Sequence, residues 1–135
     1  MWVYEDNVLD EIPEGYYGFV YRIINKETNK QYIGKKFFYS QKQRQVKGKK
    51  KKYKAESDWK EYYGSNEILA GEVAEFGRDK FERYILKLCK TKGDCSYFES
   101  KYQFQEDVLL NPDKYYNSWI QCKIHRKHLK ITDAG

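Results

Sequence analysis

The sequence predicts an α+β domain in which a small three-stranded antiparallel sheet is flanked by helices. Two neighbouring runs rich in aromatic and β-branched residues, separated by a polar turn, predict a β-hairpin near the start of the chain. Two later segments carry apolar residues at helical spacing, and a third β-like run lies between them. This order favours helices packed on a small antiparallel sheet. A length of 135 residues fits one domain.

The hairpin is predicted from residues 18–24, "GFVYRII", and residues 31–38, "QYIGKKFF". The residues between them, "NKETNK", have the polar composition of a turn. Gly34 interrupts the second strand, which indicates a bulge or a close approach by another group. Residues 40–56 have almost no apolar content and are predicted to form a mobile loop.

The remaining elements alternate helix, strand and helix. The first helix is predicted between Ser65, a candidate N-cap, and Gly77, a C-terminal stop. The run "KFERYILKLC" is predicted to form the third strand. The run "DCSYFESKYQFQEDVLL" is predicted to form the second helix, capped by Asp94 or Ser96.

We expect three parts along the chain: an acidic N-terminal segment (1–15), the folded domain (16–120) and a basic C-terminal tail (121–135). No apolar run approaches the roughly 20 residues of a membrane span. The N-terminus lacks the basic-then-apolar pattern of a secretory signal. These features predict a cytoplasmic protein without a membrane partner.

The net charge of +6 is concentrated in one part of the chain. Residues 1–20 carry five acidic and no basic side chains, whereas residues 21–56 carry thirteen basic and two acidic ones. Residues 57–135 carry thirteen of each sign, and residues 47–54 contain six lysines. A charge run is often only a solvated loop extended by self-repulsion. Because this run directly follows a candidate site, we predict contact with a polyanion that weakens as salt rises.

The three cysteines are irregularly spaced, which predicts free thiols in a reducing compartment. Cys122, His125 and His128 offer an alternative zinc site near the end of the chain. Their spacing matches no zinc-finger pattern, so we expect ordinary buried thiols.

Two tyrosines face each other across the predicted hairpin. Tyr21 and Tyr32 are eleven residues apart, and a tight turn brings them close on the sheet. Nearby cations stabilise a phenolate and lower its pKa, so a tyrosine tuned in this way takes a proton from water. The alternative is ordinary packing in a strand. The local cations are Lys35, Lys36, Lys42 and Arg44.

The residues around these tyrosines resemble the GIY-YIG nuclease family. "FVY" ends at Tyr21 and "YIG" begins at Tyr32; the second triplet matches in full, but Phe19 stands where glycine is usual and Val20 replaces isoleucine. "YYGSNEILAGEVAEFGRDKFERYIL" resembles the helix and third strand of phage-encoded, free-standing homing-type members. "YFESKYQF" resembles their metal-binding helix, and "YYNS" resembles a late asparagine motif. The resemblance covers about residues 16–120.

This resemblance implies hydrolysis of DNA phosphodiester bonds with one divalent metal, Mg²⁺ or Mn²⁺. Tyr21 is implied to activate water, Tyr32 to support it, and Glu99 to bind the metal. Asn117 falls on the asparagine motif. The usual arginine has no clear counterpart, so three basic residues stay open for its role: Lys35, Lys36 and Arg44.

The predicted DNA contacts are mainly to phosphates, which position a protein without reading sequence, so we expect low sequence specificity. The substrate is expected to be double-stranded DNA, and a homodimer is one route to double-strand cutting. Two alternatives remain: a non-catalytic nucleic-acid-binding module on the same fold, and a restriction or repair nuclease. The predicted contact residues are Lys42, Lys47, Lys49, Lys50, Lys51, Lys52, Lys54, Tyr63, Arg126 and Lys127.

Overall fold

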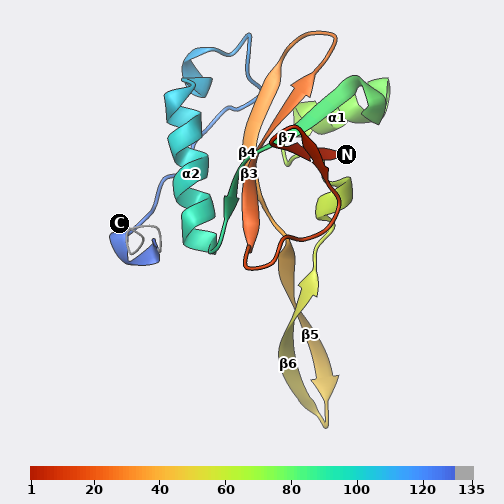
Figure 1. Ribbon diagram of the computed structural model, residues 1–135, viewed down its shortest axis with the longest axis vertical. Coiled ribbons are helices and arrows are strands. Elements are labelled where there is room, and N and C mark those ends of the chain that lie inside the picture. The colour runs from red at the N-terminus through yellow and green to blue at the C-terminus, as the bar shows by residue number, and fades with distance from the viewer. Residues whose placement is uncertain (130–135) are drawn as a thin grey trace.

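The computed structural model describes residues 1–129, so residues 130–135 of the predicted basic tail lie outside the described part. A five-stranded sheet of order β2-β1-β7-β3-β4 forms the centre, and a separate two-stranded ribbon extends from it (Figure 1). The strands are β1 (Trp2–Tyr4), β2 (Asn7–Leu9), β3 (Gly18–Asn25), β4 (Gln31–Phe37), β5 (Tyr39–Val46), β6 (Lys49–Glu56) and β7 (Phe81–Cys89).

Two α-helices cover opposite faces of the sheet. The helices are α1 (Glu67–Phe76) and α2 (Lys92–Gln105), with short 3-10 turns η1 (Trp59–Glu61), η2 (Arg78–Lys80), η3 (Val108–Leu110) and η4 (Arg126–His128). Figure 1 shows α2 along one face and α1 on the other. The predicted α+β class, hairpin, third strand and both helices are confirmed. None of the helices within residues 1–129 has the length and apolar character needed to cross a bilayer.

The sheet has five strands rather than the predicted three, because the acidic N-terminal segment contributes two. Strand β1 pairs in parallel with β7, and β2 pairs with β1. Trp2 is 1% exposed, and its indole Nε1 donates to the carbonyl oxygen of Trp59 at 2.6 Å. Strands of three residues are too short to show an alternating pattern, so they were not predicted from sequence.

The predicted mobile loop is instead the ribbon of β5 and β6. These strands pair antiparallel over eight residues each, from Tyr39 opposite Glu56 to Val46 opposite Lys49. Backbone hydrogen bonds hold such a ladder whatever its side chains are. The ribbon has no apolar face, so it lacks the alternation by which a strand is recognised.

Both α-helices begin at caps that differ from the predicted ones. Asn66, not Ser65, caps α1, because its side-chain oxygen accepts from the backbone N–H groups of Ile68 and Leu69. Thr91 caps α2 by accepting from the backbone N–H of Asp94. The predicted stop at Gly77 is confirmed, with a φ of 95° that a side chain would disfavour.

One face of the sheet holds the tyrosine pair. Tyr21 is opposite Gly34 in the β3–β4 ladder and is 1% exposed. A Cβ atom at position 34 would lie 2.5 Å from the Tyr21 hydroxyl oxygen. Glycine in the "YIG" triplet is therefore required by the close approach of the neighbouring phenol, not by a turn.

We predict that Gly34→Ala destabilises the fold by about 1–3 kcal/mol, because the packed Tyr21 ring must move. The urea midpoint of unfolding measures this. Gly71→Ala is the matched control: a Cβ there meets nothing within 4 Å, and alanine improves a helix. Equal midpoints for the two variants would contradict the packing constraint.

Candidate active site

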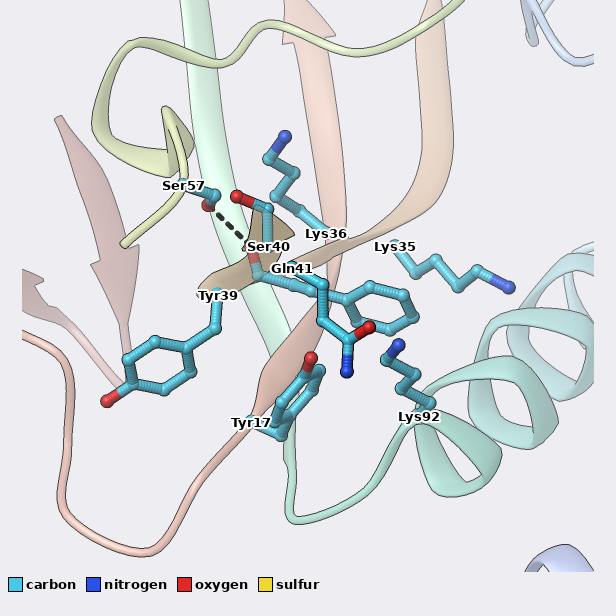
Figure 2. A pocket seen from close by; sticks show the side chains of 9 residues that line it. Tyr17, Lys35, Lys36, Tyr39, Ser40, Gln41, Ser57 and Lys92 are labelled. Atoms are coloured by element: carbon cyan, nitrogen blue, oxygen red, sulfur yellow. Dashed lines mark hydrogen bonds between the residues drawn. The ribbon is translucent and has the colours of Figure 1, made fainter. Parts of the chain in front are cut away.

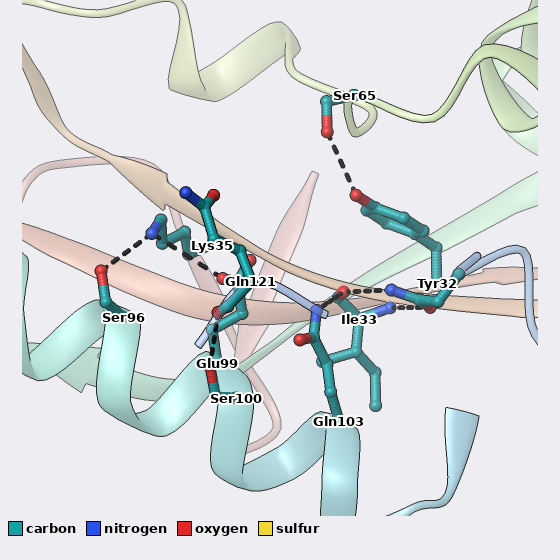
Figure 3. Close-up of polar contacts among 10 residues, drawn as sticks. Tyr32, Ile33, Lys35, Ser65, Ser96, Glu99, Ser100, Gln103 and Gln121 are labelled. Atoms are coloured by element: carbon teal, nitrogen blue, oxygen red, sulfur yellow. Dashed lines mark hydrogen bonds and ion pairs between the residues drawn. The ribbon is translucent and has the colours of Figure 1, made fainter. Parts of the chain in front are cut away.

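A cleft of about 400 Å³ lies at the β4 edge of the sheet, between that strand, α2 and the segment after residue 116. Four of the predicted site residues line it: Tyr32, Lys35, Glu99 and Asn117. Figure 3 shows Tyr32 and Lys35 on β4 and Glu99 on α2, with Ser65 reaching the tyrosine from across the cleft. Residues far apart in the sequence therefore meet in one place.

Glu99 and Lys35 form an ion pair inside the cleft. Lys35 Nζ lies 3.7 Å from Glu99 Oε1 and donates to Ser96 Oγ at 2.8 Å. The glutamate side chain is only 16% exposed. Burial raises the pKa of Glu99, and the Lys35 charge opposes that rise. The carboxyl group is thus held in a poorly solvated place beside one neighbouring cation.

Asn117 and a residue missed by sequence reasoning, Gln103, hold the backbone of Ile33. Asn117 Oδ1 accepts from the Ile33 N–H at 3.1 Å, and its Nδ2 donates to the Ile33 carbonyl oxygen at 2.8 Å. Gln103 Nε2 donates to the same oxygen at 2.9 Å. Asn117 uses both the oxygen and the nitrogen of its side-chain amide on β4, so it holds this strand in position.

The Gln103 side-chain oxygen, Oε1, is buried without a hydrogen-bond partner in the described structure. The carbonyl of Ile33 can only accept, so the amide nitrogen must face it and Oε1 must face away. Gln103 follows Glu99 by one helical turn and also lines the cleft. This four-residue spacing on the predicted metal-binding helix is the signal that would have identified it.

The two tyrosines differ in their access to the cleft. Tyr32 lines it and shares a hydrogen bond of 3.1 Å with Ser65 Oγ. Tyr21 is buried beneath, with its ring centroid 6.1 Å from Tyr32 and 5.9 Å from Tyr62. Its pKa is raised well above the ordinary value, first by burial and then by the neighbouring tyrosines.

The expected lowering of a tyrosine pKa by nearby cations is therefore wrong. Burial also raises the pKa of Tyr32, and Glu99 adds to the rise for both phenols. Lys35 forms an ion pair with Glu99, and Lys36 forms one with Asp58. Neither lysine stabilises a phenolate. Both tyrosines keep their protons at neutral pH.

Lys36 holds the segment before α1 against β4. Its Nζ lies 2.7 Å from Asp58 Oδ1 and 4.2 Å from the centre of the Tyr62 ring. The hydrogen bond from Lys36 lowers the pKa of Asp58. Since Tyr62 packs on Tyr21, Lys36 contacts the ring that covers the buried tyrosine and does not line the cleft itself.

Arg44, the third candidate for the family's basic residue, is not brought to the cleft. It lies on β5, where its guanidinium is 5.4 Å from the centre of the Tyr53 ring. Among residues 1–129, no arginine lines this cleft. Tyr63 is also elsewhere: its ring packs 4.1 Å from the guanidinium of the buried Arg83.

A second hollow adjoins the cleft through Lys35 (Figure 2). Lys35 and Lys36 line it together with two residues that sequence reasoning missed, Tyr17 and Lys92. The Lys92 ammonium lies 5.6 Å from the centre of the Tyr17 ring. Lys92 begins α2, so only the docking of this helix on β4 brings its charge beside the two lysines.

The predicted DNA-contact lysines occupy two surfaces. Lys42, Lys47, Lys49, Lys50, Lys51, Lys52 and Lys54 are exposed on the β5–β6 ribbon and its turn. Arg126 and Lys127 are exposed on η4, which approaches the start of α2 closely at Gly93. Lys127 and Lys92 border one hollow, so the positive surface continues from η4 towards Lys35.

Glu99 and Gln103 are the residues of the cleft that would hold a single divalent cation. A carboxylate and an unpartnered amide oxygen are the hard donors that Mg²⁺ or Mn²⁺ prefers. Within residues 1–129 no group of three His, Cys, Asp or Glu side chains could hold a metal, so a closed protein cage is not formed there. Cys89 and Cys95 are buried and free, and Cys122 is exposed and free.

Comparisons with known proteins identify the family. Residues 2–120 match the family model described as "Putative endonuclease segE, GIY-YIG domain". Searches of curated proteins and of solved structures returned no match. The match begins at Trp2 and so includes the N-terminal strands as well as the cleft. The tyrosine hairpin, the glutamate helix and the asparagine that positions β4 thus accompany a family match over most of the chain, and the protein belongs to the GIY-YIG endonucleases.

Proposed function

We propose that this endonuclease hydrolyses phosphodiester bonds of double-stranded DNA with the help of one divalent metal ion. The observation that carries the proposal is the meeting of a half-buried carboxyl group, an unpartnered amide oxygen, an ammonium group and a phenol in one cleft. The carboxyl group and the amide oxygen can bind a metal ion, and the ammonium group and the phenol can contact the phosphate. The positive surfaces on the β5–β6 ribbon and around η4 and the start of α2 suit a long polyanion.

Glu99 is proposed as the metal ligand, with Gln103 Oε1 as a second donor, directly or through water. The ion supplies charge stabilisation and orientation of the phosphate when bound. The hydrogen bond to Ile33 holds Gln103 in place, and Glu99 lies one turn earlier on the same helix, α2. Both proposed metal ligands are therefore positioned before substrate binds. Mg²⁺ and Mn²⁺ both suit this oxygen-donor set.

Lys35 is proposed to serve two partners in turn. In the ion pair its charge lowers the pKa of the Glu99 carboxyl and so favours the ionised form against the effect of burial. With the carboxylate engaged by a metal ion, the Lys35 ammonium would be free to pair with a substrate phosphate instead. Lys35 therefore takes the charge-stabilising role for which the cleft provides no arginine within residues 1–129.

Tyr32 is proposed as the phenol that contacts the attacking water or the phosphate, because it opens onto the cleft. Tyr21 supports it from below and is itself covered by Tyr62. One cleft acts on one strand at each engagement, so double-strand cutting requires a second copy or a second event.

Glu99→Gln should lower the rate of Mg²⁺-dependent plasmid cleavage by about 10²-fold or more, because it removes the charged metal ligand. Conversion of supercoiled plasmid to nicked and linear forms measures the rate, with an EDTA arm. Glu75→Gln, an exposed glutamate of α1, is the control and should cut as the wild type does. Cleavage by Glu99→Gln at the wild-type rate would refute the proposed metal site, and DNA binding without cleavage by wild type would support a non-catalytic module.

Metal affinity should fall as pH decreases through the raised pKa of Glu99, beginning at a higher pH than the ~4.3 of an ordinary glutamate. The reason is that the protonated carboxyl does not bind the ion. Calorimetric titration with Mn²⁺ from about pH 5 to about pH 8 measures it without turnover. Glu99→Gln should bind weakly at every pH, and a wild-type affinity independent of pH would oppose this assignment.

Tyr32→Phe should slow cleavage more than Tyr21→Phe, by about 10²-fold against about 10-fold, since only Tyr32 lines the cleft. Single-turnover cleavage rates separate the two, and urea unfolding checks that both variants fold. If Tyr21→Phe were the slower variant, Tyr21 would be the water-activating group and the Tyr62 cover would have to open in the complex.

A further inference from the structure

We propose that the β5–β6 ribbon enters the major groove of duplex DNA and reads adenines with a column of three glutamines. The inference rests on the proposed DNA substrate but requires no cleavage. It also departs from the low sequence specificity expected for this segment as a disordered basic loop. The observation that carries it is the register of the two strands.

The ribbon has two unlike faces because side chains alternate along each strand. On one face Gln41, Gln43 and Gln45 of β5 project beside lysines of β6. The ladder places Gln41 opposite Lys54, Gln43 opposite Lys52 and Gln45 opposite Lys50. This face therefore carries a column of amides next to a column of ammonium groups. The other face carries Lys42, Arg44, Lys49, Lys51 and Tyr53.

All three glutamines are exposed, as are the lysines opposite them. The ribbon is a sheet of its own, with no strand of the main sheet paired to it. Figure 1 shows it projecting away from the body of the protein. Isolated two-stranded ribbons are marginally stable in water, and lysines packed this densely repel one another. A polyanionic partner would stabilise the ribbon and neutralise the repulsion between its lysines.

The dimensions fit duplex DNA. The two strands of a ribbon lie about 4.8 Å apart, and the major groove, about 12 Å wide, admits a two-stranded ribbon. Alternate residues of a strand are about 6.8 Å apart, which is about two base-pair steps. The three glutamines therefore span about five base pairs, with contacts at alternate positions.

The glutamine face continues into the active-site region. Gln41 lines the same hollow as Lys35 and Lys36, and Figure 2 shows it beside Tyr17 at the root of the ribbon. The ammonium of Lys54, opposite Gln41, lies 4.1 Å from the centre of the Tyr39 ring. A duplex on this face is therefore directed towards Lys35 and the cleft, so recognition and cutting would fall at a fixed distance.

Glutamine suits base reading better than phosphate binding. Its amide both donates and accepts, and it pairs with the N6 and N7 atoms of adenine in the major groove. Lysine supplies the phosphate contacts that hold the ribbon in place. On this face the glutamines of β5 therefore read bases, and the lysines of β6 bind phosphates.

The test is selection of binding sites from a random duplex library in EDTA, so that no cleavage is needed. Wild type should enrich adenines at alternate positions within about five base pairs, with about 5- to 150-fold preference per contacted adenine. The triple variant Gln41→Ala, Gln43→Ala, Gln45→Ala should lose this preference while its salt dependence of binding stays at the wild-type slope. Its urea midpoint should match wild type because the side chains are exposed.

The matched variant Lys50→Ala, Lys52→Ala, Lys54→Ala should keep the preference but bind more weakly. Its salt slope should fall by up to about 2.7, at about 0.9 for each phosphate that a lysine no longer neutralises. The proposal is overturned if wild type selects no sequence, if the glutamine variant keeps the preference, or if single strands bind better than duplex. Plasmid cleavage in Mg²⁺, run in parallel, tests the proposed function separately.

Discussion

The backbone of Ile33 is the point on which the site depends. Strand β4 forms an edge of the sheet, where unpaired N–H and C=O groups would otherwise face outwards. Asn117 and Gln103 satisfy both groups of Ile33 with side-chain amides. Because these amides come from α2 and from the segment after it, the same bonds dock both elements onto the strand that carries Tyr32 and Lys35.

Burial gives this cleft its chemical character. Glu99, Tyr21 and Tyr32 all have raised pKa values, with burial as the leading cause. A poorly solvated site of this kind strengthens the attraction between a carboxylate and a cation. Lys35 supplies one positive charge beside Glu99. The Gln103 side-chain oxygen has no hydrogen-bond partner in the described structure, so it could contact a second cation. The raised pKa values keep both phenols protonated at neutral pH.

Most of the excess positive charge lies outside this cleft, on the β5–β6 ribbon. The core is aromatic and nearly neutral, whereas the lysines lie on a ribbon that adds nothing to either hydrophobic cluster beyond Tyr39 at its base. Lysines at this density would destabilise a buried strand, but on an exposed ribbon they remain solvated. The basic ribbon and the residues of the cleft therefore lie on separate parts of the fold.

The α+β class, the hairpin with its two tyrosines, both helices and the position of Glu99 on the second helix could all be predicted from the sequence. They follow from periodicity and short motifs, which are local. Which side chains meet could be seen only in the folded protein. Burial reversed the expected pKa shift of the tyrosines, and strand pairing turned a basic loop into a two-faced ribbon. Docking of α2 on β4 brought Gln103 and Lys92 to the site. Burial, register and docking depend on contacts between residues far apart in the chain, and no local pattern records them.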